Sequence, residues 1–251
     1  MTDASGTLVL LRHGESTANA DGLFTGLLDV PLSGGGRAEA HRAAQLLRDL
    51  RCGFSAVFCS EQRRTIETAR ILADEGVFDP RVLARDWRLD ERNYGALTGR
   101  RKTDVAEEFG YEQFLEWRRS VDVPPPPMSS EQLERFRAEP PYNALPSGAV
   151  TATESLRDVE RRVRAFHEER VVPALGSVGA VLVIAHGNSL RGYCAVLDGL
   201  DDHEIRHLNI PTGHPLVYRL RSGVPVVRGG EYADQEGALR AAEELRRVGG
   251  T

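Results

Sequence analysis

Short apolar runs alternate along the chain with longer amphipathic segments. The apolar runs are rich in Val, Leu and Ile and include residues 7–12, 56–59 and 180–185. The segments between them repeat their apolar residues at helical spacing. This alternation is typical of a parallel sheet covered by helices. The pattern therefore predicts an α/β fold with three layers, α/β/α, in which a mainly parallel sheet is flanked by helices.

The predicted elements extend over most of the chain. Strands are expected at 7–12, 56–59, 81–83, 180–185, 215–220 and 224–228. Helices are expected at 37–50, 62–74, 154–172, 189–197 and 235–248. A chain of 251 residues can bury a substantial core without disulfides or metals. We expect a single domain over residues 1–251.

The alternation breaks between residues 93 and 153. Two short helical patterns, 102–109 and 112–120, are followed by four prolines at positions 124–127 and a proline pair at 140–141. A loop of this length is uncommon in a compact domain unless it covers something. We expect residues 93–153 to form an inserted lid over the active site at the carboxyl edge of the sheet. Residues 230–251 are expected to form a C-terminal tail.

Composition narrows the class of protein. Hydrophobic residues make up 41% of the chain and charged residues 27%, as in ordinary globular proteins. The apolar runs are too short to cross a bilayer, and no basic, hydrophobic leader begins the chain, so we expect a cytoplasmic protein with no membrane partner. Three widely spaced cysteines indicate reduced thiols. The net charge of −5 argues against nucleic-acid binding, although a few convergent arginines can still make a cationic cleft.

Two predicted strands end in the same dipeptide, His-Gly. The first continues as Arg12-His13-Gly14-Glu15-Ser16 and the other as Ala185-His186-Gly187-Asn188-Ser189. Ligands of parallel sheets bind beyond the carboxyl ends of the strands. The two imidazoles are therefore expected in one crevice. The glycine after each histidine lets a ligand approach the backbone.

Two histidines with an acidic residue could bind zinc, or they could bind a phosphoryl group. The neighbouring arginines favour the phosphoryl group. Arg12 precedes the first histidine, and Arg63 and Arg64 follow a strand that should open onto the same edge. Guanidinium groups would repel a divalent metal, whereas they match phosphate oxygens. The residues predict a small anionic phosphorylated substrate and no metal. The run Ser33-Gly34-Gly35-Gly36 predicts a helix start, because no phosphate-loop lysine follows it.

These residues carry a resemblance to a known family. The chain resembles the histidine phosphatase superfamily and, within it, the cofactor-dependent (2,3-bisphosphoglycerate-dependent) phosphoglycerate mutases. The resemblance runs nearly end to end. It rests on LRHGES (11–16), FTGLLDVPLS (24–33), RRTIETA (63–69), ERNYGALTG (91–99), WRRS (117–120), AHGNSLR (185–191) and LNIPTGHPLVY (208–218).

The resemblance implies a role for each matching residue. His13 is the expected nucleophile, which forms a phosphohistidine; an imidazole suits this role because one ring nitrogen keeps a lone pair near neutral pH. Arg12, Arg64 and His186 are expected to hold the transferring phosphoryl group, and Glu91 to shuttle the proton. The expected substrate-binding residues are Ser16, Asn19, Thr25, Gly26, Arg92, Tyr94, Lys102, Arg118, Arg119 and Asn188.

The resemblance also implies an activity. It is the interconversion of 3-phosphoglycerate and 2-phosphoglycerate in glycolysis and gluconeogenesis, through a phosphohistidine primed by 2,3-bisphosphoglycerate. A homodimer or homotetramer is expected. Two positions depart from the family pattern: Asn93 stands where a histidine is usual, and Ala18 where a tryptophan is common. Both bear on the choice of substrate.

Three alternatives remain open. The first is a broad-specificity histidine-type phosphatase that acts on small phosphate esters, although Lys102, Arg118 and Arg119 in the insertion favour a mutase. The second is a bisphosphoglycerate mutase, but Ser16 favours the glycolytic isomerase because the synthase-type enzymes tend to carry glycine there. The third is a non-enzymatic phosphate-binding module. This class is disfavoured because the expected nucleophile and proton shuttle are both present.

Overall fold

The sheet has a parallel centre and an antiparallel edge. A computed structural model describes residues 5–176 and 179–247 of the chain. Its strands are β1 (Ser5–Arg12), β2 (Phe54–Cys59), β3 (Leu83–Arg85), β4 (Ala180–Ala185), β5 (Leu216–Arg221), β6 (Val224–Pro225) and β7 (Glu231–Tyr232). They are ordered β3-β2-β4-β1-β5-β6, and β7 also pairs with β5. Strands β1 to β4 pair in parallel, whereas β5 is antiparallel to β1. The predicted fold class is confirmed.

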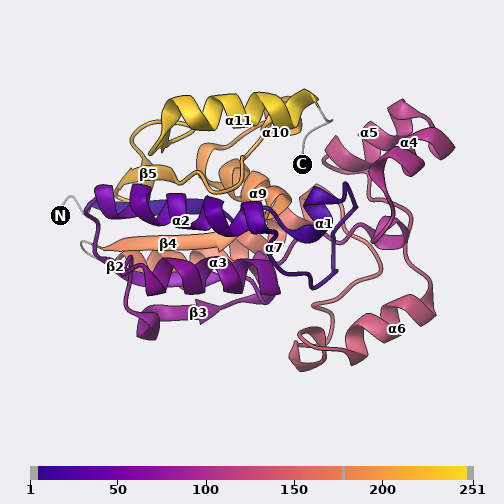
Figure 1. Cartoon of the computed structure of the whole chain (residues 1–251), viewed down its shortest axis with the longest axis horizontal. Helices are drawn as coiled ribbons and strands as arrows, with labels where there is room; N and C mark the ends of the chain where they lie inside the picture. Colours follow the sequence, from indigo (N-terminus) through magenta and orange to yellow (C-terminus); the bar gives the residue numbers. More distant parts are fainter. Residues whose placement is uncertain (1–4, 177–178, 248–251) are drawn as a thin grey trace.

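Helices cover both faces of this sheet (Figure 1). The longer ones are α2 (Gly34–Asp49), α3 (Arg63–Asp74), α7 (Leu156–Phe166), α9 (Gly187–Asp198) and α11 (Gln235–Arg247), and the shorter ones are α1 (Thr17–Ala20), α8 (Val172–Leu175) and α10 (Asp202–His207). Alternate residues of a strand face opposite sides of a sheet. In β1, Val9 and Leu11 pack with the core under α2 and α3, whereas Leu8 and Leu10 pack with the core under α7 and α9. The continuous apolar runs therefore belong to strands buried on both faces.

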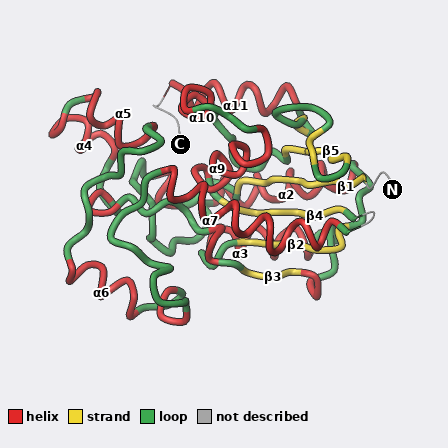
Figure 2. The backbone as a smooth tube through the Cα atoms, turned by 180° about the vertical axis from the view of Figure 1, so that it is seen from behind, coloured by secondary structure: helices red, strands yellow, loops and turns green. Residues whose placement is uncertain are grey.

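The insertion lies beyond one end of the sheet (Figures 1 and 2). It contains α4 (Lys102–Phe109), α5 (Tyr111–Arg119) and α6 (Ser130–Ala138). It shares two small apolar clusters with the loop after α1, one around Phe24, Tyr94 and Phe114 and another around Leu27 and Tyr142. Helix α6 was not predicted, because none of its residues is fully buried and its apolar face is only Leu133 and Phe136, which pack against the second cluster. The sequence signal it does carry is its capping box, in which Ser129 and Gln132 bond each other's backbone.

Several strand boundaries differ from the prediction, and the strand expected at 224–228 is only Val224–Pro225. Strand β3 begins at Leu83 rather than residue 81, because Asp79 and Pro80 start a 3-10 turn there. Strand β7 was not predicted; it pairs with β5 and leads into α11, so part of the expected C-terminal tail belongs to the sheet. The expected end of that helix, residue 248, lies outside the described residues. No helix in the described ranges is long and apolar enough to span a bilayer.

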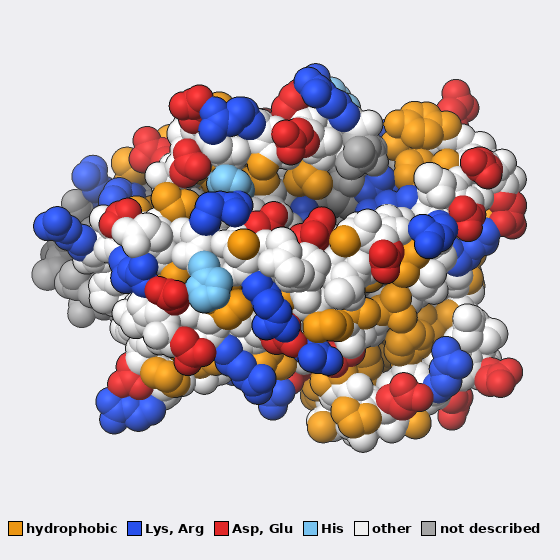
Figure 3. All heavy atoms as spheres, viewed as in Figure 1, with side chains coloured by type: hydrophobic (Ala, Val, Ile, Leu, Met, Phe, Trp, Pro, Cys, Tyr) orange, Lys and Arg blue, Asp and Glu red, His pale blue; other side chains and the backbone are white. Residues whose placement is uncertain are grey.

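Charge is distributed unevenly over the face shown in Figure 3. Acidic and basic side chains are mixed over α2 and α11, whereas hydrophobic side chains gather over the insertion. Basic side chains also lie in the hollow between the end of α11 and the α4–α5 pair (Figure 3). The insertion and the C-terminal helix thus flank a recess at the carboxyl edge of the sheet.

Candidate active site

The strand register brings the two His-Gly pairs side by side. Strands β1 and β4 are neighbours, with Arg12 opposite Ala185, and the His13 N–H donates to the Ala185 carbonyl at 3.1 Å. The residues that follow are His13 and His186, whose ring centroids lie 4.8 Å apart at 63°. Their exposed fractions are 2% and 0%. Two segments 173 positions apart in the chain thus place both imidazoles in one buried site.

The His13 ring is held in one tautomer. Its Nδ1 donates to the Gly14 carbonyl at 2.6 Å, so the lone pair lies on Nε2. Burial, together with the charges of Arg64 and Arg12, lowers the pKa of His13 well below its usual value, so the ring is neutral near pH 7. A neutral imidazole with a free Nε2 lone pair is the form that a nucleophile requires.

Gly14 and the glycines after Ser33 have a packing role. A Cβ on Gly14 would lie 2.1 Å from the Gly36 carbonyl oxygen, and one on Gly36 would lie 1.9 Å from that of Glu15. The loop after β1 therefore rests directly on the backbone at the start of α2. Ser33 caps this helix by accepting from the Gly36 N–H, which confirms the predicted helix start.

His186 is oriented by its neighbours. Arg64 Nε donates to its Nδ1 at 3.1 Å, so Nε2 carries the proton and donates to Ser60 Oγ at 2.8 Å. Burial and the charge of Arg64 lower the pKa of His186 well below its usual value. His186 is thus neutral, with its ring fixed between α3 and the end of β2.

Two predicted arginines are buried at this edge. Arg64 also donates to the carbonyls of Leu28 at 2.8 Å and Gly26 at 3.3 Å. Arg12 NH1 donates to the Ile210 carbonyl at 2.9 Å, whereas its buried Nε has no hydrogen-bond partner among the described residues. A buried guanidinium N–H without a partner is costly, and an anion would satisfy it.

Glu91 lies in the loop after the 3-10 turn η2 (Trp87–Leu89) and is 8% exposed. Its Oε1 accepts from the Arg92 N–H at 2.7 Å and from Asn188 Nδ2 at 3.2 Å. Asn188 also donates to Tyr94 Oη at 3.0 Å. Arg92 lies over the Tyr94 ring, and its buried NH1 is another donor with no partner in the described part of the chain. These four predicted residues therefore form one buried polar network.

The insertion adds positive charge to the site. Lys102, the only lysine in the sequence, begins α4, and burial followed by the charges of Arg118 and Arg12 lowers its pKa to about 7. Arg118 on α5 is fully buried over the Phe114 ring, and burial lowers its pKa to about 10. Within the described residues, no group of three or more His, Cys, Asp or Glu side chains is arranged to hold a metal ion. Crowded buried cations of this kind favour an anionic ligand.

Four predicted binding residues contact one another or the arginines rather than the histidines. Ser16 caps α1, and Asn19 Oδ1 accepts from the Ser16 N–H and hydroxyl. Asn19 Nδ2 donates to Thr25 Oγ1 at 3.5 Å. Gly26 offers only its carbonyl, which faces Arg64. This set shapes the loop beside the site.

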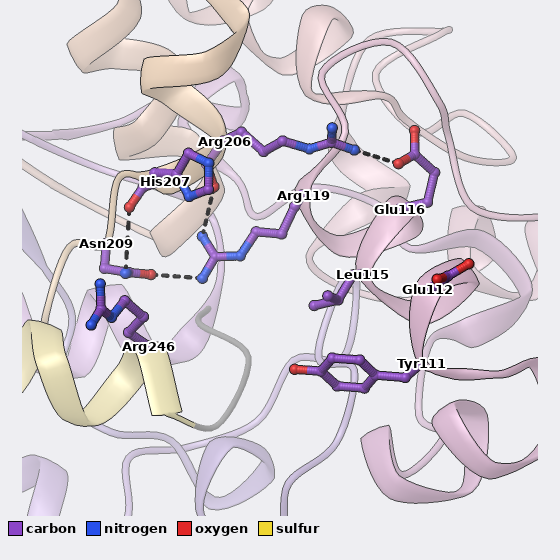
Figure 4. A pocket seen from close by; sticks show the side chains of 9 residues that line it. All are labelled: Tyr111, Glu112, Leu115, Glu116, Arg119, Arg206, His207, Asn209 and Arg246. Carbon is purple, nitrogen blue, oxygen red and sulfur yellow. Dashed lines mark hydrogen bonds and ion pairs between the residues drawn. The ribbon is translucent and has the colours of Figure 1, made fainter.

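Arg119 bonds the segment that follows α10. It donates to the carbonyl of Leu208 at 3.3 Å and to Asn209 Oδ1 at 2.7 Å. It lines a cavity of about 510 Å³ between α5 and the end of α11, where Arg246 and Tyr111 also project (Figure 4). Arg118 and Arg119 therefore face different spaces, as expected for neighbours about 100° apart on a helix.

The structure also reveals polar residues that the sequence reasoning missed. Ser60, Gln62 and Arg191 are fully buried, and each bonds a predicted site residue: His186, Arg64 and Asn188. Ser60 and Gln62 follow directly after β2, where a polar residue is a signal for the site edge. At the two positions that depart from the family pattern, the Asn93 side chain bonds the Thr151 carbonyl and the Gly95 N–H, and the methyl group of Ala18 is buried.

With this geometry in place, the chain can be compared with known proteins. The sequence profile of the histidine phosphatase superfamily (branch 1) matches residues 8–140 and 129–229. The chain belongs to this superfamily.

Two curated relatives match almost the whole chain. A 2,3-bisphosphoglycerate-dependent phosphoglycerate mutase of Thermobifida fusca (strain YX) is 46% identical over 97% of this chain and 99% of its own. A protein of the same name from Streptomyces griseus subsp. griseus is 44% identical over 99% of both chains. Among solved structures, a mycobacterial glucosyl-3-phosphoglycerate phosphatase superposes with a TM-score of 0.65 at 24% identity, covering 86% of this chain and 90% of its own. That likeness shows the fold alone.

Proposed function

We propose that this protein is an isomerase that interconverts 3-phosphoglycerate and 2-phosphoglycerate in glycolysis and gluconeogenesis. The observation that carries the proposal is the buried His13–His186 pair, with its free His13 Nε2 lone pair and surrounding guanidinium groups. The end-to-end similarity to phosphoglycerate mutases identifies the substrate class.

The residues present fit a bisphosphorylated primer. Arg12 Nε and Arg92 NH1 are buried donors without partners in the described residues, and the cations of Lys102 and Arg118 lie nearby. Such a cluster of basic groups is suited to a ligand with several negative charges. Arg12, Arg64, Arg92, Lys102, Arg118 and Asn188 would hold 2,3-bisphosphoglycerate. When bound, this compound supplies the phosphoryl group that primes His13.

The chain's own groups divide the work of phosphoryl transfer. His13 Nε2 attacks phosphorus, a P–N bond forms, and the P–O bond to the sugar-acid oxygen breaks. Glu91 gives its proton to the departing oxygen. In the second step the accepting hydroxyl attacks the phosphohistidine: its proton passes to Glu91, a new P–O bond forms and the P–N bond to His13 breaks. Arg12, Arg64 and His186 donate hydrogen bonds to the phosphoryl oxygens as charge spreads over them. For His186, this requires its Nε2–H to turn from Ser60 to the phosphoryl group.

A coupled assay tests this function. The rate of 3-phosphoglycerate conversion is measured through added enolase, with and without 2,3-bisphosphoglycerate, and a chelator is applied to the isolated mutase step. We expect an activity that the bisphosphate stimulates and the chelator leaves unchanged. Release of inorganic phosphate without isomerisation would contradict the proposal and favour a phosphatase.

We further propose that residues 93–153 form a lid and that the segment from residue 230 helps to close it. Support comes from the cavity between α5 and α11, which Arg119 and Arg246 share (Figure 4). A covered site keeps water from the phosphohistidine until the acceptor arrives. The proposal also includes a cytoplasmic location. It includes assembly as a homodimer or homotetramer, and light scattering would measure the mass of that assembly.

Removal of α11 is expected to raise hydrolysis relative to isomerisation several-fold. Truncation after Asp234 is preferable to truncation at Gly229, because β7 and its pairing with β5 remain. Arg246→Ala should change the ratio in the same direction. Arg240→Ala is the matched control, since both arginines pair with a glutamate on α11 but only Arg246 lines the cavity. An unchanged ratio in the truncated protein would refute closure by this segment.

A further inference from the structure

The Gln62 side chain is buried beside the two histidines' neighbours, Arg64 and Glu91, and bonds both of these residues. It follows Ser60 at the end of β2, is the N-cap residue of α3, and is 0% exposed. Its side chain makes no capping bond to the helix. A buried amide that does not cap its helix must find partners elsewhere, because an unpaired polar group in the interior is costly.

The amide finds four partners. Gln62 Oε1 accepts from the Glu91 N–H at 2.9 Å and from Arg64 NH2 at 3.0 Å. Gln62 Nε2 donates to the Gly26 carbonyl at 2.9 Å and to Tyr142 Oη at 2.8 Å. An amide has two donor hydrogens and an oxygen with two lone pairs, so every valence is used. Both Oε1 partners are donors and the Gly26 carbonyl can only accept, so the network fixes which way the amide points.

The four partners come from four different parts of the chain. Glu91 is the proposed proton shuttle, and Arg64 orients His186. Gly26 lies in the loop whose carbonyls also hold Arg64. Tyr142 belongs to the insertion, in the 3-10 turn η4 (Tyr142–Ala144), and its hydroxyl donates to the Leu27 carbonyl at 2.7 Å. One side chain therefore joins the sheet edge, the insertion and two catalytic groups.

We propose that Gln62 is a positioning residue, which sets the Glu91 carboxyl and the Arg64 guanidinium in register and couples both to the insertion through Tyr142. This inference rests on the proposed function. Enzymes catalyse phosphoryl transfer mainly by positioning the reacting groups and by electrostatic stabilisation. Misplacement of a group by about 1 Å can cost roughly 100-fold in rate. A residue that fixes the Glu91 backbone and the Arg64 side chain together controls that placement without touching substrate.

The test compares Gln62→Met, which keeps volume and removes all four bonds, with Tyr142→Phe, which removes one partner of the amide. We expect Gln62→Met to lower kcat by about 10-fold to 100-fold while KM for 3-phosphoglycerate changes less than about 3-fold. Tyr142→Phe should lower kcat by less. The double variant should be no worse than Gln62→Met, because both changes act through the same amide.

Tyr193→Phe is the matched control. Its hydroxyl is buried and bonds His167 Nδ1 at 2.9 Å, remote from the catalytic network, so it should lower Tm with kcat unchanged. A Gln62→Met variant with lowered Tm and unchanged kcat would overturn the inference, as would additive losses in the double variant. If Gln62→Met does not fold, Tyr142→Phe decides the question: a kcat equal to that of Tyr193→Phe would refute the coupling.

Failure of the Gln62 inference can be distinguished from failure of the proposed function. The wild-type protein is assayed both for isomerisation and for hydrolysis of p-nitrophenyl phosphate. Hydrolysis without isomerisation would contradict the mutase proposal, and the same variants would then be compared by their hydrolytic kcat. Isomerisation by the wild type together with an unchanged kcat in both variants would refute the role of Gln62 alone.

Discussion

His13→Ala is expected to lower isomerisation by about 10⁴-fold or more and to abolish formation of an acid-labile phosphoenzyme. The reason is that no other imidazole in the site has the same free lone pair. His186 accepts from Arg64 at Nδ1 and carries its proton on Nε2. Enolase-coupled kinetics measure the first effect, and labelling with phosphate-labelled 2,3-bisphosphoglycerate measures the second.

His41→Ala is the control for this variant. His41 lies on α2 with a side chain that is 56% exposed, and its ring bonds Glu75 at 2.9 Å. Exposed substitutions of this kind change stability little, so activity should stay within about two-fold of the wild type. Labelling that persists in His13→Ala would show that another residue carries the phosphoryl group and would refute the assigned nucleophile.

Glu91→Gln is expected to lower kcat by about 10²-fold to 10⁴-fold with little loss of stability. The substitution keeps the shape of the side chain, and its amide oxygen can still accept from the Arg92 N–H and Asn188. The amide cannot give up and retake a proton at the substrate oxygen, so both transfer steps should slow. Steady-state kinetics and thermal unfolding are measured on the same preparation.

Glu61→Gln provides the comparison at a nearby carboxyl group. Glu61 pairs at 3.2 Å with Arg85, the last residue of the edge strand β3, and within the described residues its side chain bonds no catalytic group. Its kcat should remain near that of the wild type. Equal losses in the two variants would indicate a general electrostatic effect and would remove Glu91 from its assigned role.

Much of the sheet could be predicted because its strands carry strong local signals. Residues 180–185 are apolar throughout, and the structure gives this strand the predicted bounds. The weak elements were the ones missed. Strand β7 has only two residues, and the apolar face of α6 consists of Leu133 and Phe136 alone, so the hydrophobic period of each is too short to recognise. Tertiary pairing with β5 forms β7, and capping starts α6.

The site likewise combines residues that the sequence marks and residues that only the structure reveals. The two His-Gly pairs mark strand ends in the sequence, and sheet topology makes such ends converge. Gln62 and Tyr142 give no comparable signal, since an isolated glutamine or tyrosine can occupy almost any surface position. Their importance arises from contacts across 80 residues of chain. Arg118 lies over the Phe114 ring, whereas Arg119 bonds Asn209. Which of the two neighbours takes which partner likewise depends on how α5 packs against the rest of the protein.

The sequence alone determined where most strands and helices lie along the chain and the chemistry available at the strand ends, because hydrophobic period and residue type are local properties. The tertiary structure decided which donors remain buried without partners, which tautomer each imidazole adopts, and which side chain joins the insertion to the catalytic groups. These features depend on distances between segments remote in sequence, and those distances are fixed only when the helices, the insertion and the sheet pack together.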